Sequence, residues 1–230
     1  DGNSLVVGAP GWGDYWTWTE SCGFLGWETC NRNASAQNVG HAFIYDWSSN
    51  GNINTGIDHT LRPDGWNNNT GAANWRFGQS VDVSVGSLGE MVAVGSSNEA
   101  GVGEVYVFRD GGNRTNVLPG GRESQFGYAV AIDANTGKLV VGEYNHNVDG
   151  LDGDGNDGRV WVFNHSGTNS WGNNTQFDAV LANQRFGWAV GVARDLVIAG
   201  SSWADFGDPA DQDGLVNVIL ENDTPVAFDD

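Results

Sequence analysis

The stretch "RFGQSVDVSVGSLGEMVAVGSSNEAGVGEVYVFRD" (Arg76–Asp110) contains three short apolar runs separated by glycine-rich turns. The first run follows a Phe-Gly pair, the second ends in a glycine, and the third opens on one. All three are rich in β-branched and aromatic residues and show no helical periodicity, so they predict β-strands. The stretch therefore predicts strand, short turn, strand, variable loop and strand.

The same runs recur along the whole chain. A run that ends in glycine occurs at Ser4–Pro10, Glu90–Ser97, Lys138–Tyr144 and Asp195–Ser202. A run that opens on glycine begins at Gly40, Gly103, Gly158 and Gly214. A Phe-Gly pair precedes three of the units, with its aromatic residue at Phe77, Phe126 and Phe186. Weaker fourth strands are predicted at Asn116–Gly120 and Phe177–Ala182. The chain is therefore a repeat of four-stranded units.

The middle strands of these units are almost continuously apolar, a pattern that is typical of a sheet covered on both faces. Four-stranded antiparallel units stacked face to face around an axis meet this requirement. The predicted fold is therefore all-β, a β-propeller of about four blades. The predicted units span roughly residues 1–75, 76–124, 125–184 and 185–221. The tail at 222–230 is expected to be a linker, or the start of a further domain, because "NDTPVAFDD" resembles the lead-in to cadherin-like or immunoglobulin-like repeats.

Phe-Gly before the first strand, Gly8-Ala9-Pro10 or its degenerate forms after the second, and Gly-x-Val-Tyr-Val-Phe in the third occur in a fixed order. This combination resembles the FG-GAP repeats that form the blades of integrin α-subunit propellers and of many microbial extracellular proteins. The resemblance implies an extracellular propeller. Integrin-like propellers are expected to have seven blades, and here the first unit lacks its Phe-Gly strand. The chain is therefore either a piece of a larger propeller or a small ring whose ends complete one blade.

The Phe-Gly pairs are expected to be structural. Their aromatic side chains can fill the space between neighbouring blades, and their glycines let a backbone pass closely.

An acidic stretch, "NVDGLDGDGNDGRVWVF" (Asn147–Phe163), lies between a second and a third strand. It offers five oxygen-bearing side chains between glycines, and calcium prefers six to eight oxygen ligands in a flexible loop. The predicted calcium ligands are Asp149, Asp152, Asp154, Asn156 and Asp157. A second, looser candidate consists of Asp205, Asp208, Asp211 and Asp213.

Integrin-type blades carry their calcium motif between the first and second strands. The corresponding turn here, Asp133–Lys138, is poor in carboxylates, so the family's ligands do not carry over. The alternative is that both acidic stretches are solvated turns.

The connection from Gly11 to Val39 is the longest loop of the first unit and is rich in aromatic residues. Long ordered loops on a rigid scaffold often carry binding sites, and Trp and Tyr stack on sugars or anchor protein partners. Its aromatic residues are Trp12, Tyr15, Trp16, Trp18 and Trp27. Cys22 and Cys30 are predicted to form a disulfide within it, which implies an oxidising compartment. The alternative is a local aromatic core that covers the propeller.

The composition bears on the partners. With 29 acidic and 10 basic residues the formal net charge is -19, which argues against binding to nucleic acid. The same charge fits a cation-binding protein or one that stays soluble in a salty extracellular medium. No apolar run approaches the length of a membrane-spanning helix. Glycosylation sequons, all expected in loops, begin at Asn33, Asn68, Asn113, Asn164, Asn173 and Asn222.

Nothing in the sequence indicates catalysis. The four histidines, at His41, His59, His146 and His165, have no metal-ligand spacing, and no nucleophile elbow or phosphate loop occurs. The predicted function is a non-catalytic extracellular structural or adhesive module, stabilised by calcium, that contacts other proteins or copies of itself. The alternative is a lectin-like propeller that binds carbohydrate through the tryptophan-rich loop at 11–39.

Overall fold

The structure is a computed structural model that describes most of the chain. The described residues are 4–11, 14–22, 28–36, 39–46, 57–63, 74–98, 102–110, 112–119, 125–148, 156–167, 170–204 and 214–220, with 14–22 and 28–36 described by their backbone. These ranges contain sixteen β-strands and no helix. The prediction of an all-β chain built from antiparallel sheets is confirmed.

The strands form four larger sheets, numbered here in chain order, and one separate hairpin. Sheet 1 consists of β1 (Ser4–Ala9), β4 (His41–Asp46) and β5 (His59–Leu61). Sheet 2 consists of β6 (Phe77–Gly86), β7 (Gly89–Ser96), β8 (Glu104–Arg109) and β9 (Asn113–Pro119). Sheet 3 consists of β10 (Ala129–Asp133), β11 (Lys138–Glu143), β12 (Arg159–His165) and β13 (Trp171–Asp178). Sheet 4 consists of β14 (Phe186–Ala193), β15 (Leu196–Ser201) and β16 (Leu215–Leu220).

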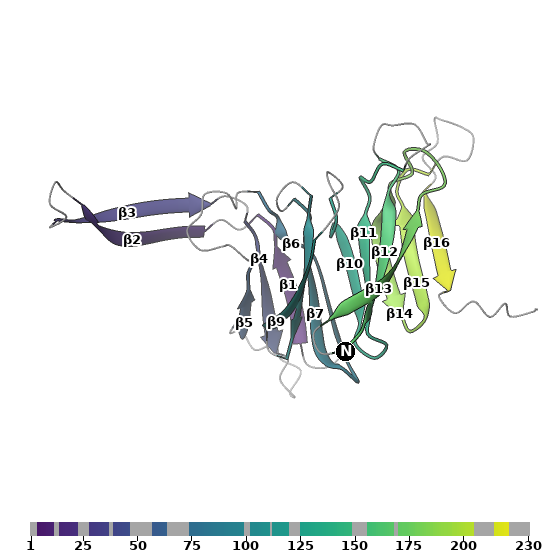
Figure 1. The fold of residues 1–230 in the computed structure, drawn as a ribbon, viewed down its shortest axis with the longest axis horizontal. Helices are drawn as coiled ribbons and strands as arrows, with labels where there is room; N and C mark the ends of the chain where they lie inside the picture. Colours follow the sequence, from purple (N-terminus) through teal and green to yellow (C-terminus); the bar gives the residue numbers. More distant parts are fainter. Residues whose placement is uncertain are drawn as a thin grey trace, which may run out of the picture.

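The four sheets pack face to face in chain order and form an open row, with sheets 1 and 4 at its two ends (Figure 1). Three apolar cores separate them. Strand β7 shows how one strand serves two cores: Met91 and Ala93 face sheet 3, whereas Val92 and Val94 face sheet 1. This alternation explains why the middle strands are continuously apolar in sequence.

Each Phe-Gly pair is buried between two sheets. Phe77, Phe126 and Phe186 are at most 4% exposed. In each pair the backbone N–H of the phenylalanine donates to a carbonyl of the preceding sheet, at 2.8 to 3.1 Å. The acceptors are the carbonyls of Val39, Val102 and Asp157, which directly precede the glycines that open the third strands. The pair therefore fixes the position of one sheet on the sheet before it.

The first strands of sheets 2, 3 and 4 also lie side by side, and polar side chains link them. Asp82 on β6 accepts a hydrogen bond from the backbone N–H of Ile132 on β10 at 2.7 Å. Asp133 at the end of β10 accepts one from the N–H of Arg194 at 2.7 Å. Burial acts to raise the pKa of Asp133, but hydrogen bonds from Arg194, Asn135 and Thr136 outweigh it and lower that pKa below the ordinary value.

The hairpin of β2 (Asp14–Cys22) and β3 (Glu28–Ala36) corrects one expectation, because residues 11–39 were predicted to be a loop. Alternating aromatic residues and threonines in β2 favour a strand, and this propensity is sufficient once a second strand pairs with it. The hairpin extends away from the row of sheets (Figure 1). Among the described residues its two strands pair only with each other.

Candidate functional site

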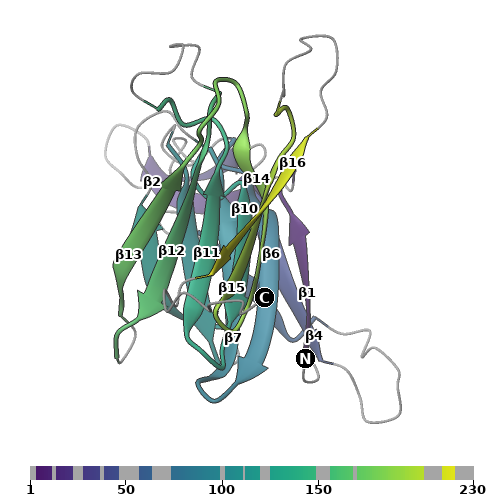
Figure 2. The same ribbon diagram turned by 90° about the vertical axis from the view of Figure 1, so that its right-hand side faces the viewer.

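The strand ends that border the predicted binding segments lie at the same end of every sheet, named here the loop end. It is the end at which β1, β7, β11 and β15 finish and β4, β8, β12 and β16 begin. The aromatic hairpin connects β1 to β4, the first acidic stretch connects β11 to β12, and the second connects β15 to β16. Figure 2, which looks onto sheet 4, shows that β12 and β16 begin at the same end. Strand ends that are far apart in the sequence therefore lie on one face of the molecule.

The structure describes only part of the predicted site. Trp12, Trp27, Asn68, Asp149, Asp152, Asp154, Asp205, Asp208, Asp211, Asp213 and Asn222 lie outside the described residues. For Tyr15, Trp16, Trp18, Cys22, Cys30, Asn33 and Asn173 the structure describes the backbone only. Cys22 lies opposite Glu28 and Cys30 opposite Glu20, so the two cysteines are diagonal neighbours across the hairpin. The calcium, disulfide and aromatic-platform assignments remain predictions.

The expectation that all glycosylation sequons fall in loops is wrong for four of them. Asn33, Asn113, Asn164 and Asn173 lie in β3, β9, β12 and β13. Asn113 is exposed at the first position of β9, and its side-chain amide donates to the carbonyl of Asp110 at 3.1 Å. Asn164 is half-buried. Sequon matches do not depend on backbone conformation, so the pattern alone gave no information on strand or loop.

Asp157, a predicted calcium ligand, is fully buried and connects sheet 3 to the approach to β14. Its two carboxylate oxygens accept hydrogen bonds from the N–H groups of Val148 and Asn183, each at 2.9 Å. Asn156 beside it accepts one from Arg185 through its carbonyl, at 2.9 Å. The carboxylate therefore has a structural role, and each oxygen keeps a second lone pair that could serve a cation.

A second acidic residue, Glu143, is buried at the end of β11. Glu143 is 1% exposed and accepts a hydrogen bond from the indole N–H of Trp161 at 2.6 Å. His146 lies 3.9 Å from the same oxygen. Within the described ranges, no three His, Cys, Asp or Glu side chains gather closely enough to hold a metal ion.

An aromatic cluster that the sequence analysis did not identify lies at the loop end of sheets 3 and 4. The ring centroids of Tyr128, Tyr144 and Trp188 are 4.5 to 4.9 Å apart. The guanidinium of Arg185 lies over both Trp188 and Trp203, and the latter is 40% exposed. The sequence predicts that Trp188 packs between neighbouring blades, and its ring does contact Tyr128 and Tyr144 of sheet 3. The signal that could have identified the cluster is the aromatic residue directly after two of the three Phe-Gly pairs.

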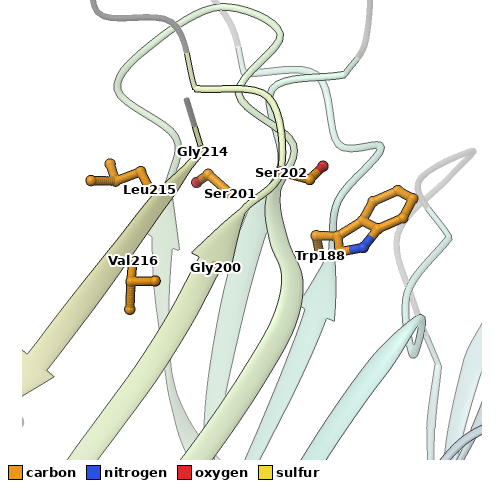
Figure 3. A pocket seen from close by; sticks show the side chains of 7 residues that line it. All are labelled: Trp188, Gly200, Ser201, Ser202, Gly214, Leu215 and Val216. Carbon is orange, nitrogen blue, oxygen red and sulfur yellow. The ribbon is translucent and has the colours of Figure 1, made fainter. Parts of the chain in front are cut away.

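Two cavities of about 350 Å³ lie at opposite ends of the sheets. The first opens at the loop end of sheet 4 and is lined by Trp188, Gly200, Ser201, Ser202, Gly214, Leu215 and Val216 (Figure 3). The second is polar and lies between the first strands of sheets 2, 3 and 4, near Asp82, Asp133 and Arg194. Burial raises the pKa of Asp82, although hydrogen bonds from the amides of Ile132 and Val83 act against this rise.

The described residues contain no helix long and apolar enough to cross a membrane. No protein-family model matches the chain, and a search of curated proteins finds no significant relative.

Proposed function

We propose that this chain is a non-catalytic extracellular structural or adhesive module that contacts other proteins, or copies of itself, through its loop end. The β2–β3 hairpin carries this proposal. It extends from the loop end, and an isolated two-stranded hairpin is at best marginally stable in water (Figure 1). A hairpin of nine-residue strands is stabilised when the surface of a partner covers it, so this hairpin favours a role in contacts with other proteins.

The extracellular assignment is supported by the sequence. A net charge of -19 suits a salty medium, and the exposed side chain of Asn113 is compatible with glycosylation. The two cysteines on adjacent strands of one hairpin agree with a disulfide in an oxidising compartment.

We further propose that sheets 1 to 4 are blades of an FG-GAP-type β-propeller. This is supported by the repetition of one interface three times, each built around a Phe-Gly pair. Calcium at the loop end is part of the proposal, because several carboxylates within a short segment repel each other unless a cation is present.

The test replaces residues 12–38 by a short Gly-Ser connection between Gly11 and Val39. Beads coated with the full chain are expected to clump in calcium-containing buffer, and beads coated with the shortened chain to stay dispersed. The melting temperature of the two chains should agree, because the hairpin lies outside the three cores. Equal clumping of both kinds of beads would contradict a role of the hairpin, and dispersed beads with the full chain would contradict self-adhesion.

Carbohydrate binding is the second candidate, and the aromatic cluster of Tyr128, Tyr144 and Trp188 favours it. Aromatic rings at a surface stack on sugar rings. A glycan array probed with the full chain tests this function. Binding that is weakened by Tyr144→Ala or Trp188→Ala in this cluster, or by Trp16→Ala or Trp18→Ala in the hairpin, would replace the protein-contact proposal, whereas a blank array would remove the alternative.

A further inference from the structure

The cavity at the loop end of sheet 4 occupies a position that is filled in the other three sheets. Two glycines define this position in every sheet: one near the end of the second strand and one just before the third. In sheet 4 they are Gly200 and Gly214, and both line the cavity, with Gly200 between Val216 and Trp188 in Figure 3. The other pairs are Gly8 and Gly40, Gly95 and Gly103, and Gly142 and Gly158.

In sheets 1, 2 and 3 the next Phe-Gly pair packs directly on these two glycines. A Cβ atom added at Gly142 would lie closer than 3.0 Å to the carbonyl oxygen of Gly187, a separation that real Cβ atoms do not adopt. The same clash occurs between Gly8 and Gly78 and between Gly95 and Gly127. The glycines before the third strands approach the phenylalanine carbonyls equally closely, at Gly40, Gly103 and Gly158. These contacts require glycine because a backbone occupies the space of a side chain.

Sheet 4 has the same glycines without the backbone that requires them. Among the described residues, a Cβ atom at Gly200 would meet nothing closer than Ala189 of its own sheet, at 3.7 Å. At Gly214 it would meet only the carbonyl oxygen of Ser201, at 3.3 Å. Its glycines are preserved, and no described residue occupies the docking position.

The apolar residues around this position show the same contrast. Two apolar residues of each third strand, the second and the fourth after the glycine that precedes the strand, point toward the next sheet. In sheets 1, 2 and 3 these residues are at most 1% exposed. They are Ala42 and Ile44, Val105 and Val107, and Val160 and Val162. The corresponding residues of sheet 4, Val216 and Val218, are 66% and 62% exposed. Ile198 on the neighbouring strand is 40% exposed, whereas its counterparts Ala93 and Val140 are fully buried.

We propose that the outer face of sheet 4 is an acceptor for a further β-sheet that opens on an aromatic-glycine pair, as another unit of this repeat does. The acceptor consists of Ile198, Gly200, Gly214, Val216 and Val218. The three Phe-Gly pairs that open described strands are already engaged between the sheets of this chain, so the occupant supplies a pair of its own. This inference is independent of calcium, of extracellular location and of the hairpin.

The experiment adds one unit to the protein. A second copy of residues 179–230 is appended after Asp230, so that the copy brings its own Phe-Gly pair and its own copy of sheet 4. One face of the added sheet packs on the acceptor, and its outer face stays uncovered, as the outer face of sheet 4 is in the parent chain. The ten residues at 221–230 can span the length of the six-residue β16, which lets the copy reach the acceptor. Val218→Cys in the original sheet 4 reports on coverage through its rate of labelling by a maleimide, read by mass spectrometry of that peptide.

Labelling at position 218 is expected to be about tenfold or more slower in the lengthened chain than in the 230-residue chain, because it then requires the interface to open. Gly200→Ala in the original sheet 4 of the lengthened chain should restore fast labelling of position 218. The same substitution in the 230-residue chain should leave the melting temperature unchanged, since the added methyl meets no close atom.

Labelling of the lengthened chain at the rate of the parent chain would overturn the proposal. Slow labelling that persists with Gly200→Ala would also overturn it, because the glycine contact would then have no role. Labelling of the parent chain that slows with its own concentration would identify a second copy, whose three strand-opening Phe-Gly pairs are already engaged, as the occupant and would refute the assignment.

Discussion

Gly142 and Gly200 occupy equivalent places in the repeat and have opposite surroundings, which makes them a matched pair for substitution. Gly142→Ala forces a methyl group against the carbonyl of Gly187, and we expect a loss of about 2 kcal/mol in the free energy of unfolding. Gly200→Ala should change it by less than about 0.5 kcal/mol. Urea unfolding of both variants, followed by tryptophan fluorescence, gives the two values. Equal losses would show that the close contact at Gly142 does not constrain the fold.

A second residue-scale prediction concerns acid. The lowered pKa of Asp133 means that its contribution to stability is full above the unfolded pKa of about 3.8. This contribution is lost as the pH falls below that value and through the lower folded pKa. Asp133→Asn should therefore be less stable than the parent chain at pH 7, and the difference should shrink as the pH falls toward 2.

Melting temperatures of the parent chain and of Asp133→Asn across this range provide the measurement. Asp82→Asn is the control, because burial raises the pKa of Asp82 and its contribution has the opposite dependence on pH. A difference between the parent chain and Asp133→Asn that is constant with pH would rule out titration of this carboxylate as its cause.

At the scale of the element, the acidic connection between β11 and β12 yields a prediction about metal. Calcium is expected to raise the melting temperature of the chain, with a gain of about 2.7 kcal/mol at a hundred times its dissociation constant. The triple substitution Asp149→Asn, Asp152→Asn and Asp154→Asn should abolish this gain. Asp157 is left intact in that variant because its carboxylate holds two backbone amides.

Differential scanning calorimetry with calcium, with magnesium and with a chelator separates specific binding from general screening of the negative charge. A matched triple variant of the second acidic stretch carries Asp205→Asn, Asp208→Asn and Asp211→Asn. It shows whether any calcium-dependent rise in melting temperature comes from that stretch. Identical melting curves with calcium and with chelator would contradict a calcium site in both connections.

The strands that were predicted best are the four runs that end in glycine, which are β1, β7, β11 and β15. An almost continuously apolar sequence admits little else in an all-β chain, and it marks these strands whether both faces are buried, as in β7 and β11, or one face is exposed, as in β1 and β15. The outer strands were predicted too late in the sequence: β9 begins at Asn113 and β13 at Trp171. Their first halves are polar because an outer strand has few neighbours to cover it, so no apolar pattern marks them.

The predicted site was harder to derive than the fold. The sequence assigns the predicted binding segments to connections between the second and third strands of their units. Because the units repeat, these connections join strand ends at the same end of every sheet. The role of Asp157 was not predictable, because its two amide partners, Val148 and Asn183, are set by how sheet 3 approaches β14 and not by local sequence. The cluster around Tyr128 and Trp188 likewise depends on contact between two units.

For the whole molecule, an open row of sheets predicts a gradient of local stability. Sheets 2 and 3 are covered on both faces, whereas sheets 1 and 4 each have one uncovered face that exposes Leu5 and Val7 or Val216 and Val218. In repeat proteins each unit is stabilised by its neighbours, so the end units open first. Amide hydrogen exchange in β7 and β11 should be at least about tenfold slower than in β1 and β15.

Strands β7, β11 and β15 each lie between two other strands of their sheets, so strand position does not account for the expected difference between them, whereas β1 lies at the edge of its sheet. Uniform exchange across them would indicate that the row unfolds as one cooperative unit. Faster exchange in β7 than in β15 would contradict the arrangement of the cores.

The contacts between Phe-Gly pairs and paired glycines also have a consequence for how such a protein can evolve. Because the join between neighbouring sheets is made largely by backbone atoms, a duplicated unit carries a complete connector at each face. The number of units can then change by gene duplication without compensating mutations. The parts of the loop-end connections outside these contacts can meanwhile diversify. One inherited scaffold can in this way acquire new recognition properties unit by unit.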